Sequence, residues 1–139
     1  LGALAVMLLA AVDPLEQLKK GRDTGKRNLA EEFYNGMIRY YAIKGTMPYS
    51  GNPSGVAIAS GVMSAAVQSA IDVGELKSGF HQAPNREVIF STGTPTVLTV
   101  CFQPESKSFQ LDTNTIFNNT GGNAASCGLA TSTCSWCIR

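Results

Sequence analysis

The first 44 residues constrain the fold of this chain most, because an uncharged apolar run passes directly into a charged helical pattern. Residues 1–12 contain no charged side chain, whereas residues 13–44 hold seven of the eleven Lys and Arg residues and five of the ten Asp and Glu residues. Asp13 and Pro14 lie at the junction. Either Asp13 caps a new helix with Pro14 at its first position, or Pro14 kinks one continuous helix. In both cases we expect a rod that extends beyond the hydrophobic core of a single domain.

Residues 14–44 have the pattern of an amphipathic helix. Apolar side chains recur at helical spacing and predict one buried face, formed by Leu29, Phe33, Met37 and Tyr40. We expect two favourable i,i+4 pairs on the exposed surface, Glu16–Lys20 and Asp23–Arg27. Three glycines lower the helix propensity by about 1 kcal/mol each relative to alanine, namely Gly21, Gly25 and Gly36. Gly45 is predicted to cap the C-terminus of the helix.

Residues 45–139 predict one globular head, so the expected fold class is α+β, with a stem helix over residues 1–44. A loop and a small helix are expected within residues 45–80, the helix covering residues 56–73. Alternating β-branched and aromatic residues predict a small antiparallel sheet within residues 87–111, with strands at residues 87–91, 96–103 and 107–111. Residues 112–139 have no periodicity and are expected to form a Cys-rich coil.

Four cysteines occur in the chain, and three of them lie in the last thirteen residues: Cys101, Cys127, Cys134 and Cys137. An even number of cysteines predicts two disulfides, for which three pairings are possible. A zinc site is the alternative, although no second C-x2-C pair or H-x3-H motif accompanies the first. Redox catalysis by the C-x-x-C pair is less favoured, because no helix follows Cys137 to lower a thiol pKa.

Several segments of the stem and of the head together match one family pattern. An apolar run of small and aliphatic residues, Gly2-Ala3-Leu4-Ala5-Val6, is followed by a charged stretch, Leu15-Glu16-Gln17-Leu18-Lys19-Lys20-Gly21-Arg22-Asp23. An aromatic–Gly–x–x–Pro sequence then follows in Tyr40-Tyr41-Ala42-Ile43-Lys44-Gly45-Thr46-Met47-Pro48-Tyr49. These runs resemble the second half of the apolar N-terminal stretch, the charged continuation of the stem and the exit from the stem in the type IV pilin and type II secretion pseudopilin superfamily. The strand segment around Cys101 and the C-terminal cysteines look like those of disulfide-bearing pilins.

The resemblance implies a pilin-like fold and a structural function. The subunit would be inserted in the inner membrane, would be added to a helical homopolymer by the pilus assembly machinery, and would end in an extracellular surface filament. The expected assembly interface consists of Leu1, Gly2, Leu4, Val6, Leu8, Leu9, Val12 and Pro14. Residues 1–12 are shorter than the roughly 20 apolar residues that span a bilayer, so we expect further apolar residues upstream of Leu1.

Two alternative functions remain open at this point. The first is a type II secretion major pseudopilin, which commonly binds calcium in an acidic C-terminal loop. After Glu105 the only acidic residue is Asp112, and calcium sites need several oxygen ligands, so a pilus is favoured. The second alternative is a secreted binding domain with a membrane-proximal helix.

The remaining candidate sites are weaker. Five basic residues could bind anionic lipid or DNA, but the interleaved acids favour a solvated face or intersubunit salt bridges instead: Lys19, Lys20, Arg22, Lys26 and Arg27. The net charge of +1 gives no support for bulk nucleic-acid binding.

Four aromatic residues are expected to pack rather than to form an electron path: Phe33, Tyr34, Tyr40 and Tyr41. His81 is expected in a surface loop. Asn118-Asn119-Thr120 matches an N-glycosylation sequon. No motif predicts catalysis, a cofactor or a metal.

Overall fold

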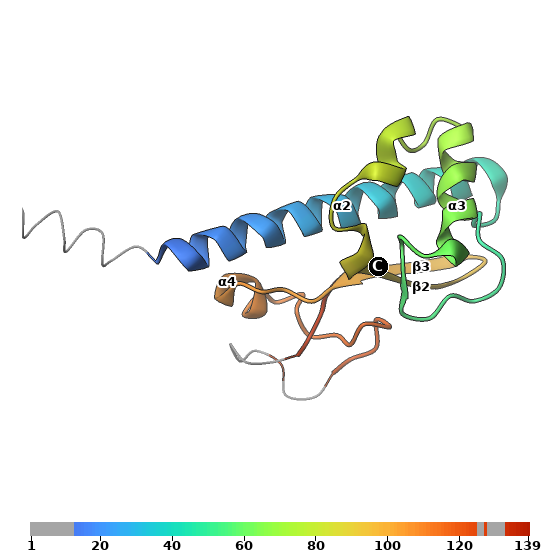
Figure 1. Ribbon diagram of the computed structural model, residues 1–139. Coiled ribbons are helices and arrows are strands. Elements are labelled where there is room, and N and C mark those ends of the chain that lie inside the picture. The colour runs from blue at the N-terminus through green and yellow to red at the C-terminus, as the bar shows by residue number, and fades with distance from the viewer. Residues whose placement is uncertain (1–12, 125–126, 128–132) are drawn as a thin grey trace, which may run out of the picture.

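The computed structural model describes residues 13–124, 127 and 133–139, and confirms an α+β fold (Figure 1). A long helix, α2 (Pro14–Lys44), packs on a four-stranded antiparallel sheet with strand order β1-β2-β3-β4. The strands are β1 (Val56–Ala57), β2 (Ile89–Thr94), β3 (Val97–Phe102) and β4 (Trp136–Ile138). The other helices are α3 (Gly61–Asp72), α4 (Lys107–Gln110) and the 3-10 turns η1 (Ser78–Gln82) and η2 (Arg86–Val88).

Helix α2 ends at Lys44 as predicted and begins at Pro14, and the part of the stem helix expected over residues 1–12 lies outside the described residues. The Asp13 side chain accepts hydrogen bonds from the backbone N–H groups of Leu15 and Glu16 at 3.1 and 3.3 Å, and Pro14 takes the first helical position. Asp13 therefore caps the helix, as the first of the two alternatives predicted. Gly45 has a φ of 75° and donates its backbone N–H to the Tyr41 carbonyl at 2.7 Å, which ends the helix with a left-handed cap.

The sheet differs from the prediction at three places. Residues 107–111 were expected to form a strand, but Lys107–Gln110 is a short helix because Ser106 accepts a hydrogen bond from the Phe109 backbone N–H as an N-cap. The helix expected over residues 56–73 starts only at Gly61, and Val56–Ala57 instead pairs with β2. The coil expected over residues 112–139 contains β4, which pairs with β3.

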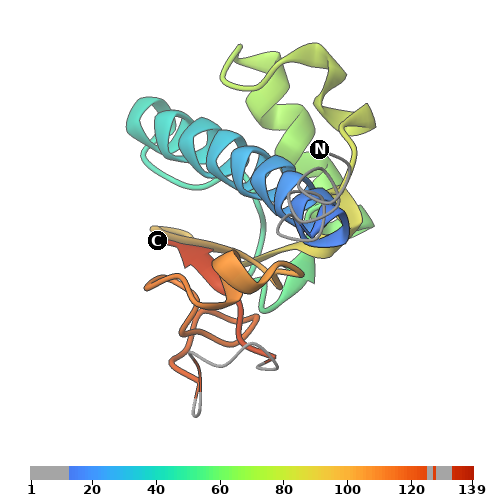
Figure 2. The same cartoon turned by 90° about the vertical axis from the view of Figure 1, so that its left-hand side faces the viewer.

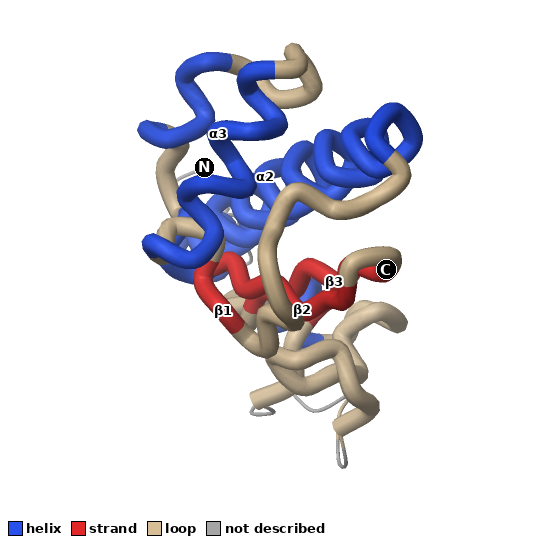
Figure 3. Tube along the Cα trace, turned by 90° about the vertical axis from the view of Figure 1, so that its right-hand side faces the viewer, coloured by secondary structure: helices blue, strands red, loops and turns tan. Residues whose placement is uncertain are grey.

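Helices α2 and α3 lie together on one face of the sheet (Figure 3). The core between them and the sheet contains the fully buried Phe33, Met37, Phe80 and Phe102. Gly36 of α2 allows the chain after α3 to approach closely, since a Cβ there would lie 2.5 Å from Leu76 Cδ2 and 3.1 Å from the Glu75 carbonyl oxygen. This glycine is thus required by packing.

The described residues between α4 and β4 cover the opposite face of the sheet. The sheet therefore lies between α2 and this segment (Figure 2). Cys101, Phe117 and Cys137 form a second, smaller buried cluster there. The backbone of Phe117 pairs with Ser135, and the Arg139 guanidinium lies 4.5 Å from the centre of the Phe117 ring. The head consequently has a layer on each face of its sheet.

Candidate functional site

The first turns of α2 extend past the sheet and expose apolar side chains. Leu15 and Leu18 are 57% and 64% exposed, and Pro14 is exposed as well. In Figure 1 this end of α2 projects beyond the strands. Of the residues predicted to mediate assembly, only Pro14 belongs to the described part. The other seven, all within residues 1–12, lie outside the described residues.

A buried carboxylate anchors α2 to the head at the point where the helix leaves the sheet. Asp23 is fully buried and accepts hydrogen bonds from the Glu105 backbone N–H at 3.0 Å and from the Ser106 N–H at 2.7 Å. Both donors belong to the turn between β3 and α4. The Glu16 carboxylate also accepts from the Lys107 backbone N–H. The projecting part of α2 is therefore fixed to this turn through backbone groups of three successive residues.

Two cations close the same junction. Lys26, which is nearly buried, lies 3.1 Å from the Glu105 carboxylate and 3.8 Å from that of Asp23. Arg22 lies 3.0 Å from Glu105. The hydrogen bond from Lys26 is the main cause that lowers the pKa of Glu105 below its ordinary value of 4.5, and the charges of Lys26 and Arg22 add to it. We call Arg22, Asp23, Lys26, Glu105 and the backbone of Ser106 the stem–head junction.

The junction divides the five basic residues of the stem into two groups. Arg22, Lys26 and Arg27 form ion pairs within the chain, the last with Glu31 at 3.9 Å. The sequence had favoured a solvated face or intersubunit salt bridges, and the pairing of Arg22 and Lys26 with Glu105 of the head was not predicted. Lys19 and Lys20 have no ion pair among the described residues. The predicted i,i+4 pairs Glu16–Lys20 and Asp23–Arg27 are wrong, because both acids bind backbone N–H groups of the head instead.

The prediction of two disulfides is confirmed, and the zinc alternative is wrong, because all four cysteines are bonded in pairs. Cys101 on β3 is bonded to Cys137 on β4, directly opposite it in the register, and Cys127 is bonded to Cys134. The first disulfide joins residues 36 positions apart and the second joins residues 7 apart. The long link holds the C-terminal strand in the sheet, and the short one closes a local loop.

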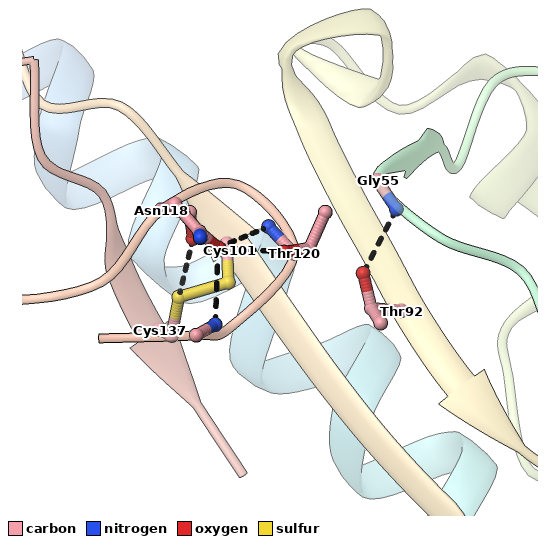
Figure 4. Close-up of a disulfide and its surroundings, with 7 residues drawn as sticks. Gly55, Thr92, Cys101, Asn118, Thr120 and Cys137 are labelled. Atoms are coloured by element: carbon pink, nitrogen blue, oxygen red, sulfur yellow. Dashed lines mark hydrogen bonds between the residues drawn. A yellow bond between two sulfur atoms is a disulfide. The ribbon is translucent and has the colours of Figure 1, made fainter. Parts of the chain in front are cut away.

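The aromatic residues of the stem pack against the core, as expected. Phe33 stacks on Phe80 with ring centroids 6.0 Å apart, and Tyr34, Tyr40 and Tyr41 are partly buried against the same core. His81 was expected in a loop but lies in η1, with Nε2 3.1 Å from the Gln68 side-chain oxygen. It is partly exposed. Asn118 lies in an exposed loop beside the disulfide that joins β3 and β4 (Figure 4).

Sequence reasoning missed the stem–head junction. Asp23 and Glu105 are 82 positions apart, and Asp23 looks like an ordinary acid on the polar surface of a helix. One local signal for the junction was present in the sequence. Ser106 can act as the N-cap of a short helix, and a helix N-terminus after Pro104 would offer free backbone N–H donors to an acid.

Comparisons of the chain with protein-family models, with curated proteins and with solved structures find no match. Within residues 13–124, 127 and 133–139, no helix is both long enough and apolar enough to cross a bilayer. In the same part of the chain, no group of three or more His, Cys, Asp or Glu side chains is placed to hold a metal ion.

Proposed function

We propose that this protein is a structural subunit of a type IV pilus-like surface filament, with a pilin-like fold. The subunit is inserted in the inner membrane before assembly, and the pilus assembly machinery adds it to a helical homopolymer on the cell surface. The observation that carries this proposal is the end of α2 that projects from the head with Leu15 and Leu18 exposed. In the sequence, twelve residues without a charge precede it.

Burial of apolar side chains supplies the driving force. Fully burying one Leu or Val contributes about 1.5–3 kcal/mol relative to leaving it in water, and the head of a single chain does not cover Leu15 or Leu18. Stems packed side by side in a filament would bury both. Transfer from a bilayer to such a bundle changes little apolar exposure, so close contacts at Gly2, Ala3 and Ala5 would decide association there.

The stem–head junction supports the same function. In a filament, the packing of the stems determines where the heads lie. This holds only if each head keeps a fixed orientation on its own stem. Asp23 and Lys26 bind the β3–α4 turn at a buried site next to the projecting end. The filament would therefore have a regular surface formed by the heads.

Electron microscopy of sheared cell-surface material tests the proposal. We expect thin, helically ordered fibres from the native chain and loss of fibres from Leu8→Asp and Leu18→Asp. Val62→Asp is the matched control, because Val62 is 60% exposed on α3, close to the 64% of Leu18. It should leave the fibres intact.

Three results would overturn the proposal. Fibres that survive both stem substitutions would contradict assembly through the stem. A stable monomer of the native chain in detergent-free buffer would instead support a secreted binding domain. Short periplasmic filaments that require calcium would support the pseudopilin alternative.

A further inference from the structure

The chain contains eight asparagines, and only Asn118 begins an Asn-x-Ser/Thr sequence without proline in the middle, since Asn52 is followed by Pro53. The sequence Asn118-Asn119-Thr120 has the form that N-glycosylation requires, with no proline in the middle. All three residues are exposed. The loop lies on the face of the sheet that α2 does not cover, next to the disulfide between Cys101 and Cys137 (Figure 4).

The side chain of Asn118 is held in place through its carboxamide oxygen. Its Oδ1 accepts hydrogen bonds from the Thr120 backbone N–H at 2.9 Å, the Thr120 hydroxyl at 2.7 Å and the Gly122 N–H at 3.0 Å. Its Nδ2 makes no hydrogen bond to any described residue. The Thr120 hydroxyl thus donates to the carboxamide oxygen of an exposed asparagine, which places the two polar groups of the sequon in direct contact.

The surrounding backbone fixes this geometry. The Asn118 N–H donates to the Gly122 carbonyl at 2.8 Å, and the Gly121 N–H donates to the Asn118 carbonyl at 3.1 Å. Gly121 has a φ of 79°, and a Cβ there would lie 2.6 Å from a methyl group of Thr99. Cys137 Sγ lies 3.8 Å from the Asn118 carbonyl oxygen. The loop is therefore pressed against β3 and presents Asn118 outward.

We propose that Asn118 is an N-glycosylation site whose glycan comes from a polyprenyl-pyrophosphate-linked oligosaccharide. In the transfer, Asn118 Nδ2 forms a bond to the anomeric carbon of the donor. The bond between that carbon and the pyrophosphate oxygen breaks, and the lipid pyrophosphate leaves with the electron pair. Nδ2 loses one proton, and neither partner is oxidised or reduced. A transferase of the cell supplies the donor site.

The position of the loop determines what the glycan covers. The segment that follows α4 lies across the sheet from α2 (Figure 2), so a glycan on this side leaves the projecting end of the stem free. It lies beside the disulfide between β3 and β4, where it shields the exposed Asn and Thr side chains of residues 113–123. The inference is independent of the filament proposal, because a secreted monomer would present the same loop.

Glycopeptide mass spectrometry of the full chain, recovered from the cells that naturally produce it, tests the site. We expect the peptide with Asn118 to carry added sugar mass, and amidase release to convert Asn118 to Asp. Asn118→Gln and Thr120→Ala should abolish the added mass, whereas Thr120→Ser and the control Asn119→Gln should retain it. Asn118→Gln could fail to fold because Oδ1 holds the loop. In that case the comparison of Thr120→Ala with Thr120→Ser tests the site, since both variants keep the Asn118 amide that accepts the glycan. An unmodified native peptide, or sugar that persists in Thr120→Ala, overturns the proposal.

Discussion

Replacing Asp23 with asparagine tests whether the stem–head junction stabilises the fold. The two carboxylate oxygens of Asp23 accept from the backbone N–H groups of Glu105 and Ser106, at 3.0 and 2.7 Å. Asparagine has nearly the same shape but offers one oxygen and one NH2 group. With the amide oxygen at the Oδ2 position, both backbone N–H groups share one neutral acceptor, and the amide NH2 group faces the Glu105 N–H at the former Oδ1 position. In either orientation Lys26 loses a negative partner.

The expected loss of stability follows from the cost of these changes. A hydrogen bond to a charged group contributes about 1.5–3 kcal/mol, and a buried polar group left without a partner costs about 1–3 kcal/mol. In Asp23→Asn the bonds to a charged oxygen become bonds to a neutral one, and the second acceptor of the Glu105 N–H is replaced by a donor. We therefore expect the free energy of unfolding to fall by about 2–4 kcal/mol, which for a domain of this size lowers Tm by roughly 6–16 °C.

Thermal and urea unfolding of the full chain in mild detergent, followed by circular dichroism, measures this change. Asp72→Asn is the matched control, since Asp72 is exposed at the end of α3 and accepts only from the Gln68 amide at 2.8 Å. An exposed substitution of this kind changes stability by about 0.5 kcal/mol or less. If the two variants lose equally little stability, the junction does not hold the stem, and the reasoning is refuted.

Three further predictions concern packing, cross-links and pH. Gly36→Ala should destabilise the protein, because overpacking costs about 1–3 kcal/mol. At Gly21 an added Cβ would meet no atom within 4 Å, so Gly21→Ala should stabilise the same helix by about 1 kcal/mol. Urea midpoints of the two variants that shift in the same direction would contradict this. Removing the Cys101–Cys137 disulfide by double alanine substitution should cost about 4 kcal/mol, and removing Cys127–Cys134 about 2 kcal/mol, because loop length sets the entropy of the unfolded chain; calorimetry that gives the reverse order would refute this. Since the folded pKa of Glu105 is below 4.5, its contribution is present above that pH and is lost as pH falls through the folded value. Glu105→Gln should therefore reduce the fall of Tm that accompanies acidification of the native protein. An unchanged fall of Tm at low pH would contradict a stabilising role for the Glu105 carboxylate.

Local signals in the sequence predicted the stem more accurately than the sheet. Asp13, Pro14 and Gly45 determine the ends of α2 by capping and proline geometry, which depend on neighbours only a few residues away. Strands β1 and β4 contain two and three residues, too few for an alternating pattern, and they exist because β2 and β3 offer pairing partners. In Lys107–Gln110 the Ser106 cap outweighed a weak alternation of polar and apolar residues.

The candidate sites show the same contrast between features that local sequence predicts and features that depend on distant residues. The number of cysteines predicted the two disulfides, but only the register, which places Cys101 opposite Cys137, determined the pairing. The ion pairs of the stem were predicted with the wrong partners, because Glu16 and Asp23 bind backbone groups about 80 to 90 positions away. Contacts of this kind depend on how the elements pack.

The junction and the long disulfide lie in series along the chain, and this order matters if the stem carries load in a filament. Asp23 binds the turn that directly follows β3, so a force on α2 is transmitted to the end of that strand. Within β3, Cys101 is covalently joined to β4 through Cys137. Strand β4 can therefore not peel from the sheet while its disulfide is intact, and the first contacts to yield are the hydrogen bonds of Asp23. Pulling on the stem of Asp23→Asn should separate stem from head at lower force, whereas loss of the Cys101–Cys137 disulfide should leave that first event unchanged and lower only the force at which the sheet opens.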